Sequence, residues 1–369
     1  MLRFLTAGES HGPCLTAIVE GLPAGLVIEI ETINRELARR QRGYGRGERM
    51  RIEQDQVEVL SGVIRGETTG APVTLRIANT DWENWRDRWA ADDLPRLTVP
   101  RPGHADYAGM VKYGLEDARP VLERASARET AARVAVGALA KQLLAVFGVA
   151  IISYVAELGH IVASIPPLPP LELGALAESS DVRCPDQVSA AQMRAAIDGA
   201  RQAGDSLGGV FIVVAMGVPV GLGSHVHWDR RLDARLAAAV MSIPAVKGVE
   251  IGPAFENARR AGTQVHDELC PDGQGGVLRT TNRAGGVEGG MSNGAPVVVR
   301  AAMKPIPTTA QPLQSLDLAT GRAAMTQYQR SDVCAVPAAS VVGEAMVAWM
   351  LADALVEKLG GDHLAEMRR

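Results

Sequence analysis

Residues 123–147 read ERASARETAARVAVGALAKQLLAVF, and this stretch decides which class of fold the chain can adopt. Beyond Ser126, small and branched apolar residues recur at helical spacing, which predicts a long helix over residues 127–147. Ser126 suits the N-cap of that helix, because its hydroxyl can accept a hydrogen bond from a free N–H group of the first turn. Arg124 stands just before the cap, near the positive end of the helix, so this end is a candidate anion site.

Short apolar runs surround this helix on both sides in the sequence. They are rich in β-branched residues and bounded by Gly or Pro, as is typical of strands, and they lie at residues 15–19, 57–60, 73–77, 151–155, 210–215 and 297–302. Further helical patterns cover residues 32–40, 190–203, 229–241 and 340–359. Because the connections are uneven and show no regular β-α repeat, we expect an α+β fold with antiparallel sheets packed on helices.

The chain of 369 residues shows no internal repeat and no clear linker, so we expect a single domain over residues 1–369. The stretch IPPLPPLEL at residues 165–173 is the one candidate for a break, and we interpret it as a rigid surface excursion. Four scattered cysteines have no metal-type spacing and are typical of reduced thiols. We find no signal-peptide pattern and no apolar run of about 20 residues, so we expect a cytoplasmic protein with no membrane partner.

Arginine is concentrated in one short loop. The formal net charge of −4 argues against a general nucleic-acid-binding protein, and an aromatic content of 4% argues against stacking on single strands. Residues 39–51, RRQRGYGRGERMR, nevertheless hold six arginines and three glycines. The planar fork of arginine suits bidentate binding of phosphate and carboxylate, so this loop is a candidate anion site. A solvated basic loop is the alternative.

Two histidines stand in glycine-containing turns. His11 lies within GESHG at residues 8–12, just before a predicted strand, and His104 ends the tight turn PRPGHAD at residues 100–106. The small neighbours let a ligand approach closely, and histidine exchanges protons near neutral pH. Both are candidates for acid–base chemistry, with an ordinary turn histidine as the alternative for each.

Three further segments lie towards the C-terminus: GGVEGGMSNG at 285–294, KPIPT at 304–308 and QRSDVC at 329–334. The glycines fit neither a P-loop nor a dinucleotide fingerprint, because no helix follows them. Together with GESHG, the arginine-rich loop, RPGHAD, ERASARET and the VKGVEIG of residues 246–252, these motifs occur in the order seen in the chorismate synthase family. The chain resembles that family from residue 1 to about residue 358.

The resemblance implies a reaction and a fold. Chorismate synthases convert 5-enolpyruvylshikimate 3-phosphate into chorismate by a trans 1,4-elimination of phosphate, the last step of the shikimate pathway, and need reduced FMN without net redox change. The implied fold is a β-α-β sandwich, with helices packed between two antiparallel sheets, and the implied assembly is a homotetramer. The substrate carries a phosphate and two carboxylates, which accounts for the surplus of arginine.

The resemblance also implies roles for particular residues. His11 protonates the reduced flavin, His104 is the general acid for the departing phosphate, and Asp332 helps to relay a proton. The positions that carry over for NADP or a substrate anion are Ser10, Arg39, Arg40 and Arg46. The positions that carry over for flavin are Arg124, Ala125, Ser126, Pro244, Ala245, Gly289, Lys304, Pro305, Ile306, Pro307, Thr308 and Arg330.

One local pattern departs from the family. His225 and His227 precede Asp229, and H-x-H on a strand would place both rings on one face, as in some metal sites. We favour a polar connection in which Asp229 caps the next helix, and we expect no metal.

Three other functions are alternatives. We expect a monofunctional enzyme that receives reduced flavin from a separate flavin reductase. The nearest alternative is a bifunctional enzyme that also reduces its own flavin with NADPH. An anion- or RNA-binding module would use the arginine-rich loop without flavin. A serine hydrolase based on Ser10 and His11 lacks the G-x-S-x-G elbow.

Overall fold

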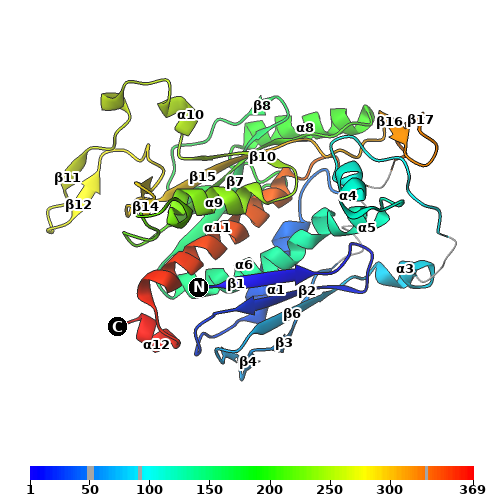
Figure 1. Ribbon diagram of the computed structural model, residues 1–369. Helices are drawn as coiled ribbons and strands as arrows, with labels where there is room; N and C mark the ends of the chain where they lie inside the picture. The colour runs from blue at the N-terminus through cyan, green and yellow to red at the C-terminus, as the bar shows by residue number, and fades with distance from the viewer. Residues whose placement is uncertain (48–53, 90–93, 329–330) are drawn as a thin grey trace.

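The computed structural model describes residues 1–47, 54–89, 94–328 and 331–369. Two antiparallel sheets, one of four strands and one of five, enclose a layer of helices (Figure 1). Each sheet turns one apolar face towards the helices, so both sheets and the helix layer share one large core. This arrangement confirms the α+β sandwich expected from the sequence.

The four-stranded sheet is formed mainly by the N-terminal part of the chain. Its strands, in spatial order, are β1 (Arg3–Ala7), β2 (Cys14–Glu20), β6 (Val73–Ala78) and β3 (Val57–Ser61). Along β2, Leu15, Ala17 and Val19 are buried whereas Ile18 is exposed, as the two-residue period of a strand requires. The strands expected at residues 15–19, 57–60 and 73–77 are confirmed, and the edge strand β1 was not anticipated.

The five-stranded sheet lies on the other side of the helices. Its strands, in spatial order, are β10 (Val246–Ile251), β15 (Val297–Met303), β9 (Gly209–Met216), β7 (Ala150–Leu158) and β8 (Ile161–Val162). Phe211 and Val213 of β9 are fully buried against the helix layer. The opposite face packs on α7 (Pro170–Ser179) through Leu173 and Ala177. The strands expected at residues 151–155, 210–215 and 297–302 are confirmed.

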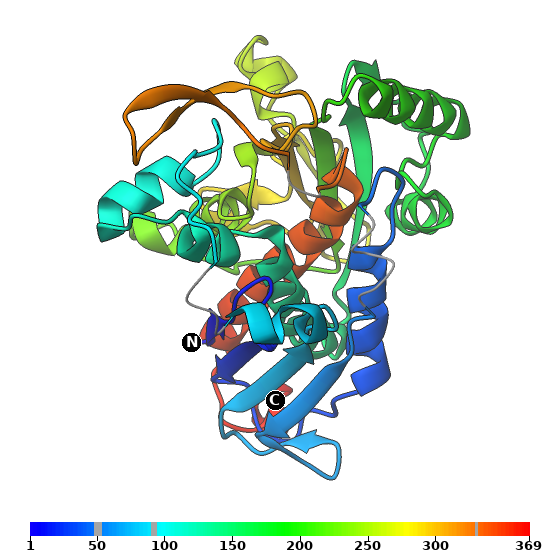
Figure 2. The ribbon, with the colours of Figure 1, turned by 90° about the vertical axis from the view of Figure 1, so that its right-hand side faces the viewer.

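The helix layer contains α1 (Ile30–Gln41), α6 (Thr130–Ala145), α9 (Leu232–Met241) and α11 (Val336–Leu359). The views in Figures 1 and 2 place α6 and α11 side by side. They approach closely at Gly137, where an added Cβ would lie 2.3 Å from that of Ala345, so a larger residue could not fit without moving the helices apart. Helix α11 is long and apolar enough to cross a membrane, but 94% of its most apolar stretch is buried inside the protein, as in a core helix.

A buried carboxylate ties the helix layer to the five-stranded sheet. Glu344 of α11 is fully buried, and it accepts hydrogen bonds from Arg39 of α1 at 2.8 and 2.9 Å. Lys141 of α6 contacts it at 2.5 Å, Ser153 of β7 at 2.6 Å and Arg183 at 3.1 Å. Burial alone would raise the pKa of Glu344, but the surrounding cations outweigh burial and hold this pKa well below its ordinary value.

Replacing Glu344 by Gln should therefore destabilise the protein by about 3–5 kcal/mol at pH 7, because three cations, one buried and two half-buried, would lose their common anion. Because the pKa of Glu344 is lowered on folding, its contribution is complete above the ordinary glutamate pKa of 4.5 and declines as pH falls below that value. The difference in free energy of unfolding between wild type and E344Q, measured by urea unfolding, should therefore become smaller at acidic pH.

Glu172→Gln, at an exposed site on α7, is the control and should change stability by less than about 0.5 kcal/mol. A difference independent of pH would contradict the assignment.

Several expected helices differ at their ends. The helix expected over residues 127–147 begins with a 3-10 turn, η1 (Ala127–Glu129), and continues as α6. The expectation that Asp229 caps a helix was wrong: Asp229 lies in a separate 3-10 turn, η2 (Trp228–Arg230), and the extended backbone of Arg231 (φ −65°, ψ 130°) separates it from α9. Residues 165–173 are only partly a surface excursion, because α7 starts at Pro170.

The remaining elements are short or peripheral, apart from α8. The helices are α3 (Trp82–Trp89), α4 (Asp106–Tyr113), α5 (Arg119–Arg124), α8 (Gln187–Gln202), α10 (Ala254–Asn257), η3 (Gly262–Gln264) and α12 (Leu364–Met367). The strands form four hairpins: β4 (Val63–Ile64) with β5 (Glu67–Thr68), β11 (Leu269–Pro271) with β12 (Val277–Arg279), β13 (Val287–Glu288) with β14 (Met291–Ser292), and β16 (Gln314–Asp317) with β17 (Arg322–Met325). Helices α4 and α5 carry residues on either side of the site described next.

Candidate active site

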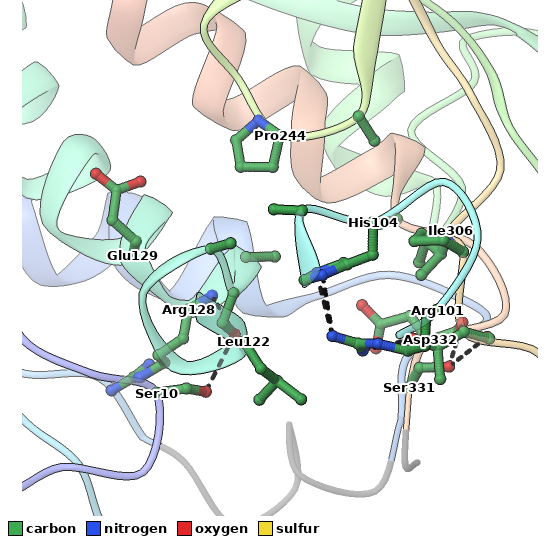
Figure 3. Close-up of a pocket in the computed structure, with 18 of the residues that line it drawn as sticks. Ser10, Arg101, His104, Leu122, Arg128, Glu129, Pro244, Ile306, Ser331 and Asp332 are labelled. Carbon is green, nitrogen blue, oxygen red and sulfur yellow. Dashed lines mark hydrogen bonds between the residues drawn. The ribbon is translucent and has the colours of Figure 1, made fainter. Parts of the chain in front are cut away.

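A cavity of about 620 Å³ lies at the N-terminal ends of α6 and α11 (Figure 3). Its volume is within the range of about 300–1,000 Å³ that is usual for ligand sites. The turn after β1, the end of α1, the residues 101–105, the end of α5 and three C-terminal segments all contribute to its wall. The residues predicted from the sequence that line it are Ser10, His11, Arg40, Arg46, His104, Arg124, Ala125, Ser126, Pro244, Ala245, Lys304, Ile306, Pro307, Thr308 and Asp332.

His11 lies in the turn between β1 and β2, and a buried carboxylate holds it. Its ring Nδ1 lies 2.7 Å from Oε1 of Glu123, and its backbone N–H donates to Oε2 of the same residue at 2.7 Å. The ring also stacks against Trp85 of α3, with a centroid separation of 4.4 Å and an interplanar angle of 31°. Glu123 belongs to α5, so this helix helps to position the histidine.

His104, which also lines the cavity, has a similar arrangement. Its Nδ1 lies 2.5 Å from Oδ1 of Asp106, and Arg101 holds the same carboxylate through Nε at 2.8 Å and Nη2 at 3.0 Å. Burial alone would raise the pKa of Asp106, but hydrogen bonds from His104 and Arg101 and the charge of Arg101 outweigh burial and hold this pKa well below its ordinary value. The carboxylate is therefore ionised at neutral pH and orients the imidazole.

Two buried arginines share a third carboxylate. Asp55 is almost fully buried, and its two oxygens lie 3.4 Å from Nη1 of Arg40 and 2.5 Å from Nη1 of Arg128. Arg40 also donates to Thr130 Oγ1 at 2.9 Å and to the carbonyl of Ala127 at 3.1 Å. Burial lowers the pKa of Arg40 to about 9; Asp55 opposes this shift, and the charge of Arg128 adds to it. The Arg40 guanidinium remains charged at neutral pH, and both arginines are fixed in the cavity wall.

Asp332 closes the cavity at the start of α11. It accepts hydrogen bonds from Arg46 Nη1 at 2.6 Å and from the backbone N–H of Gly47 at 2.7 Å. Residues 46 and 47 of the arginine-rich loop are thereby attached to the segment that leads into α11. Residues 48–51 of that loop lie outside the described residues. Ser331 donates to the carbonyl of Thr308 at 2.9 Å and links this segment to the KPIPT motif.

The start of α6 supplies polar groups as the sequence predicted. The Ser126 hydroxyl accepts from the N–H of Arg128 at 3.3 Å and caps η1, which confirms the predicted capping role. Ser126 also donates to the hydroxyl of Ser10 at 3.1 Å, and Arg124 donates to Thr6 at 2.8 and 2.9 Å (Figure 3 shows Ser10 and Arg128). These groups place a serine pair and an exposed cation at one end of the cavity.

The residues present fit a flavin that carries a phosphate. Leu122, Pro244 and Ile306 present apolar surface suited to a flat ring system (Figure 3). Ala245 adopts φ 68°, uncommon for a residue with a Cβ, and its carbonyl accepts from Lys304 N–H at 2.9 Å, which joins two of the wall segments. Lys304 and Arg124 could hold the phosphate.

Positive charge dominates the described part of the wall. Seven cationic side chains line it, and only two carboxylates do, those of Glu129 and Asp332. The cations are Arg40, Arg46, Arg101, Arg124, Arg128, Arg133 and Lys304. Such a wall suits a small molecule with several negative charges, because fixed guanidinium groups can replace the water that the ligand loses.

Three described residues predicted for the site do not line the cavity. Arg39 belongs to the buried cluster around Glu344, where it also contacts Glu36 and Glu178. Gly289 lies in the turn of the β13–β14 hairpin, and Pro305 stands between lining residues without lining the cavity itself. Arg330 lies outside the described residues.

Seven charged lining or supporting residues had no predicted role: Asp55, Arg101, Asp106, Glu123, Arg128, Glu129 and Arg133. Most lie within quoted motifs, and Arg101 and Asp106 flank the predicted histidine in RPGHAD. The proximity of an acid to a histidine in that motif was the available signal for Asp106. Nothing in the sequence connected Glu123 with His11, which lies 112 positions earlier.

The H-x-H pattern does not form a metal site of the usual kind. His225 and His227 lie in an irregular connection instead of on a strand, so their rings do not share a sheet face. Within the described residues, no group of three or more His, Cys, Asp or Glu side chains is arranged to hold a metal ion.

The fold, and a basic cavity whose wall holds two carboxylate-supported histidines, are those of an enzyme. A model of the family described as chorismate synthase matches residues 2–356, and the chain belongs to this family. The chorismate synthase of Desulforudis audaxviator is 59% identical over 372 residues, covering all of this chain and 95% of that relative. That of Chlorobaculum tepidum is 55% identical over 381 residues, covering all of this chain and 96% of that relative. A crystal structure of chorismate synthase superposes with a TM-score of 0.81 at 47% identity, covering 100% of this chain and 95% of that one. The chain is accordingly a lyase.

Replacing Arg124 by Ala should weaken the binding of FMN by about tenfold or more, because a charge-assisted hydrogen bond contributes about 1.5–3 kcal/mol. Arg119→Ala, on the same helix, is a matched control because Arg119 contacts Asp117 and the carbonyl of Pro95 and does not line the cavity. Isothermal titration with FMN measures both variants. Equal affinities for R124A and R119A would remove Arg124 from the anion site.

Proposed function

We propose that this lyase eliminates phosphate from 5-enolpyruvylshikimate 3-phosphate by a trans 1,4 route and releases chorismate. The observation that carries the proposal is the convergence of His11 and His104, each supported by a carboxylate, on a cavity lined by seven cationic side chains. The substrate carries three anionic groups, and it can leave water for such a cavity because charge-assisted hydrogen bonds replace its hydration. Membership of the chorismate synthase family supports the same reaction.

His104 acts as the general acid for the departing phosphate. Asp106 faces its Nδ1, so Nε2 is the ring nitrogen that delivers the proton. Arg101 lies beside the ring, 3.0 Å from Nδ1, and also donates to Thr308 Oγ1 at 3.0 Å (Figure 3). A guanidinium held at this position stabilises the negative charge that grows on the leaving oxygen.

The remaining groups bind the reactants and move protons. Reduced FMN, when bound, supplies an electron-rich ring that assists the elimination without net redox change. Ser126, Lys304 and Thr308, which line the cavity, would hold it. His11 takes up and returns a proton at Nε2, the ring nitrogen that faces away from Glu123. Asp332, fixed by Arg46, relays a proton away from the reacting centre.

We further propose a cytoplasmic, single-domain chain over residues 1–369 that assembles as a homotetramer. It would be monofunctional and receive reduced FMN from a separate flavin reductase, which is supported by the lack of a dinucleotide fingerprint in the glycine-rich segment 285–294. Reduction of the flavin by NADPH on this enzyme is the alternative, and Arg40 and Arg46 would then contact the nucleotide.

The decisive experiment is an anaerobic assay of phosphate release from 5-enolpyruvylshikimate 3-phosphate in three parallel reactions: photoreduced FMN, oxidised FMN, and oxidised FMN with NADPH. We expect release, with chorismate formed in step, only with photoreduced FMN. Turnover with NADPH would show the bifunctional enzyme. Absence of release in all three reactions would contradict the proposed function and favour an anion-binding module.

Replacing His104 by Ala should lower kcat by about tenfold or more while FMN still binds, because a positioned general acid typically contributes about 10²–10⁴-fold. His160→Ala is the control, since His160 is exposed at the β7–β8 turn. Steady-state rates and FMN titration provide the comparison. An unchanged kcat in H104A would exclude His104 as the acid.

A further inference from the structure

We propose that Glu123 is a positioning residue that sets the tautomer and the orientation of His11 for proton transfer. The inference rests on the proposed function, in which His11 exchanges a proton within the cavity. It does not depend on contact between Glu123 and the reactants, because Glu123 does not line the cavity. Its side chain is 3% exposed and lies directly behind the histidine.

Glu123 holds the GESHG turn at three points. Its carbonyl accepts from the N–H of Ser10 at 3.2 Å, its Oε2 accepts from the N–H of His11 at 2.7 Å, and its Oε1 faces Nδ1 of His11 at 2.7 Å. One side chain therefore fixes both the backbone and the ring edge of the same residue. Trp85 stacks on the ring face, so edge and face are both held.

The chemistry of this contact determines where the ring proton lies. An ionised carboxylate has only acceptors, and the backbone N–H that faces Oε2 is only a donor. Oε1 must therefore accept from Nδ1, which places the proton of a neutral ring on Nδ1 and the lone pair on Nε2. Nε2 points away from Glu123, so it is the nitrogen that takes up and returns the exchangeable proton.

The site contains a second histidine held by a carboxylate, and there the carboxylate has an additional partner. Asp106 faces Nδ1 of His104 in the same way, but Arg101 shares that carboxylate. Among the described residues, both hydrogen bonds to the Glu123 carboxylate come from His11. Within the described part of the chain, the Glu123 side chain thus acts on His11 alone, and its replacement should affect His11 without disturbing a described arginine.

Glu123→Gln gives a sharp test because it keeps the size and removes one acceptor. The amide oxygen should accept from the backbone N–H, which leaves the amide NH2 facing Nδ1 and requires the proton to move to Nε2. We expect long-range ¹H–¹⁵N spectra of the full-length, ¹⁵N-histidine-labelled protein to show the Nδ1–H form of His11 in wild type and the Nε2–H form in E123Q, with His11 assigned by His11→Asn. The kcat of E123Q should fall by about tenfold or more, with KM for the substrate nearly unchanged.

Two further variants complete the test. Glu123→Asp keeps two acceptor oxygens, so it should retain the Nδ1–H form and recover part of kcat. Glu172→Gln, on the exposed face of α7, should change neither the spectrum nor kcat. A proton that stays on Nδ1 in E123Q, or an Nε2–H form in wild type, would overturn the proposal, and the wild-type spectrum decides the point even if E123Q folds poorly. A changed tautomer with unchanged kcat would show that His11 transfers no proton, which separates failure of the proposed function from failure of the contact.

Discussion

The close packing of α6 on α11 is the constraint on which the site depends. The two helices lie side by side between the sheets, and at Gly137 their backbones approach as closely as the absence of a side chain permits. Residues at the starts of both helices, Arg128 and Ala335 among them, consequently line the same cavity. Helix N-termini carry partial positive charge, so the packing of the core itself creates a place that favours an anion.

Buried carboxylates organise the charges that this arrangement gathers. Asp55 fixes two arginines, Asp106 fixes Arg101 and His104, and Glu123 fixes His11. Removing such ions from water is costly unless their partners and hydrogen bonds are in place, so each carboxylate also restricts the conformations of its partners. The site therefore presents its cations and imidazoles to a ligand with little rearrangement left to make.

Much of the fold could be predicted from local pattern, and the exceptions have physical causes. Strands such as β2 and β15 are rich in β-branched residues that alternate or run continuously, so their sequences identify them. The edge strand β1, RFLTA, has no fully buried residue and gives a weak pattern. Helix α7 begins at Pro170, inside a proline-rich stretch whose sequence is typical of a break between elements. Proline is nevertheless well suited to the first turn of a helix.

The sequence by itself determined the chemical groups: two turn histidines, a surplus of arginine, and a capped helix start beside them. Only the tertiary structure decided which of these groups meet. Neighbouring Arg39 and Arg40 separate completely, the first to the Glu344 cluster and the second to the cavity, because successive residues of a helix point to different sides. Glu123 contacts His11, which lies 112 positions earlier in the chain, because the end of α5 lies against the turn between β1 and β2. Residue type determines which chemistry a side chain is capable of, whereas the packing of distant elements determines which groups it contacts.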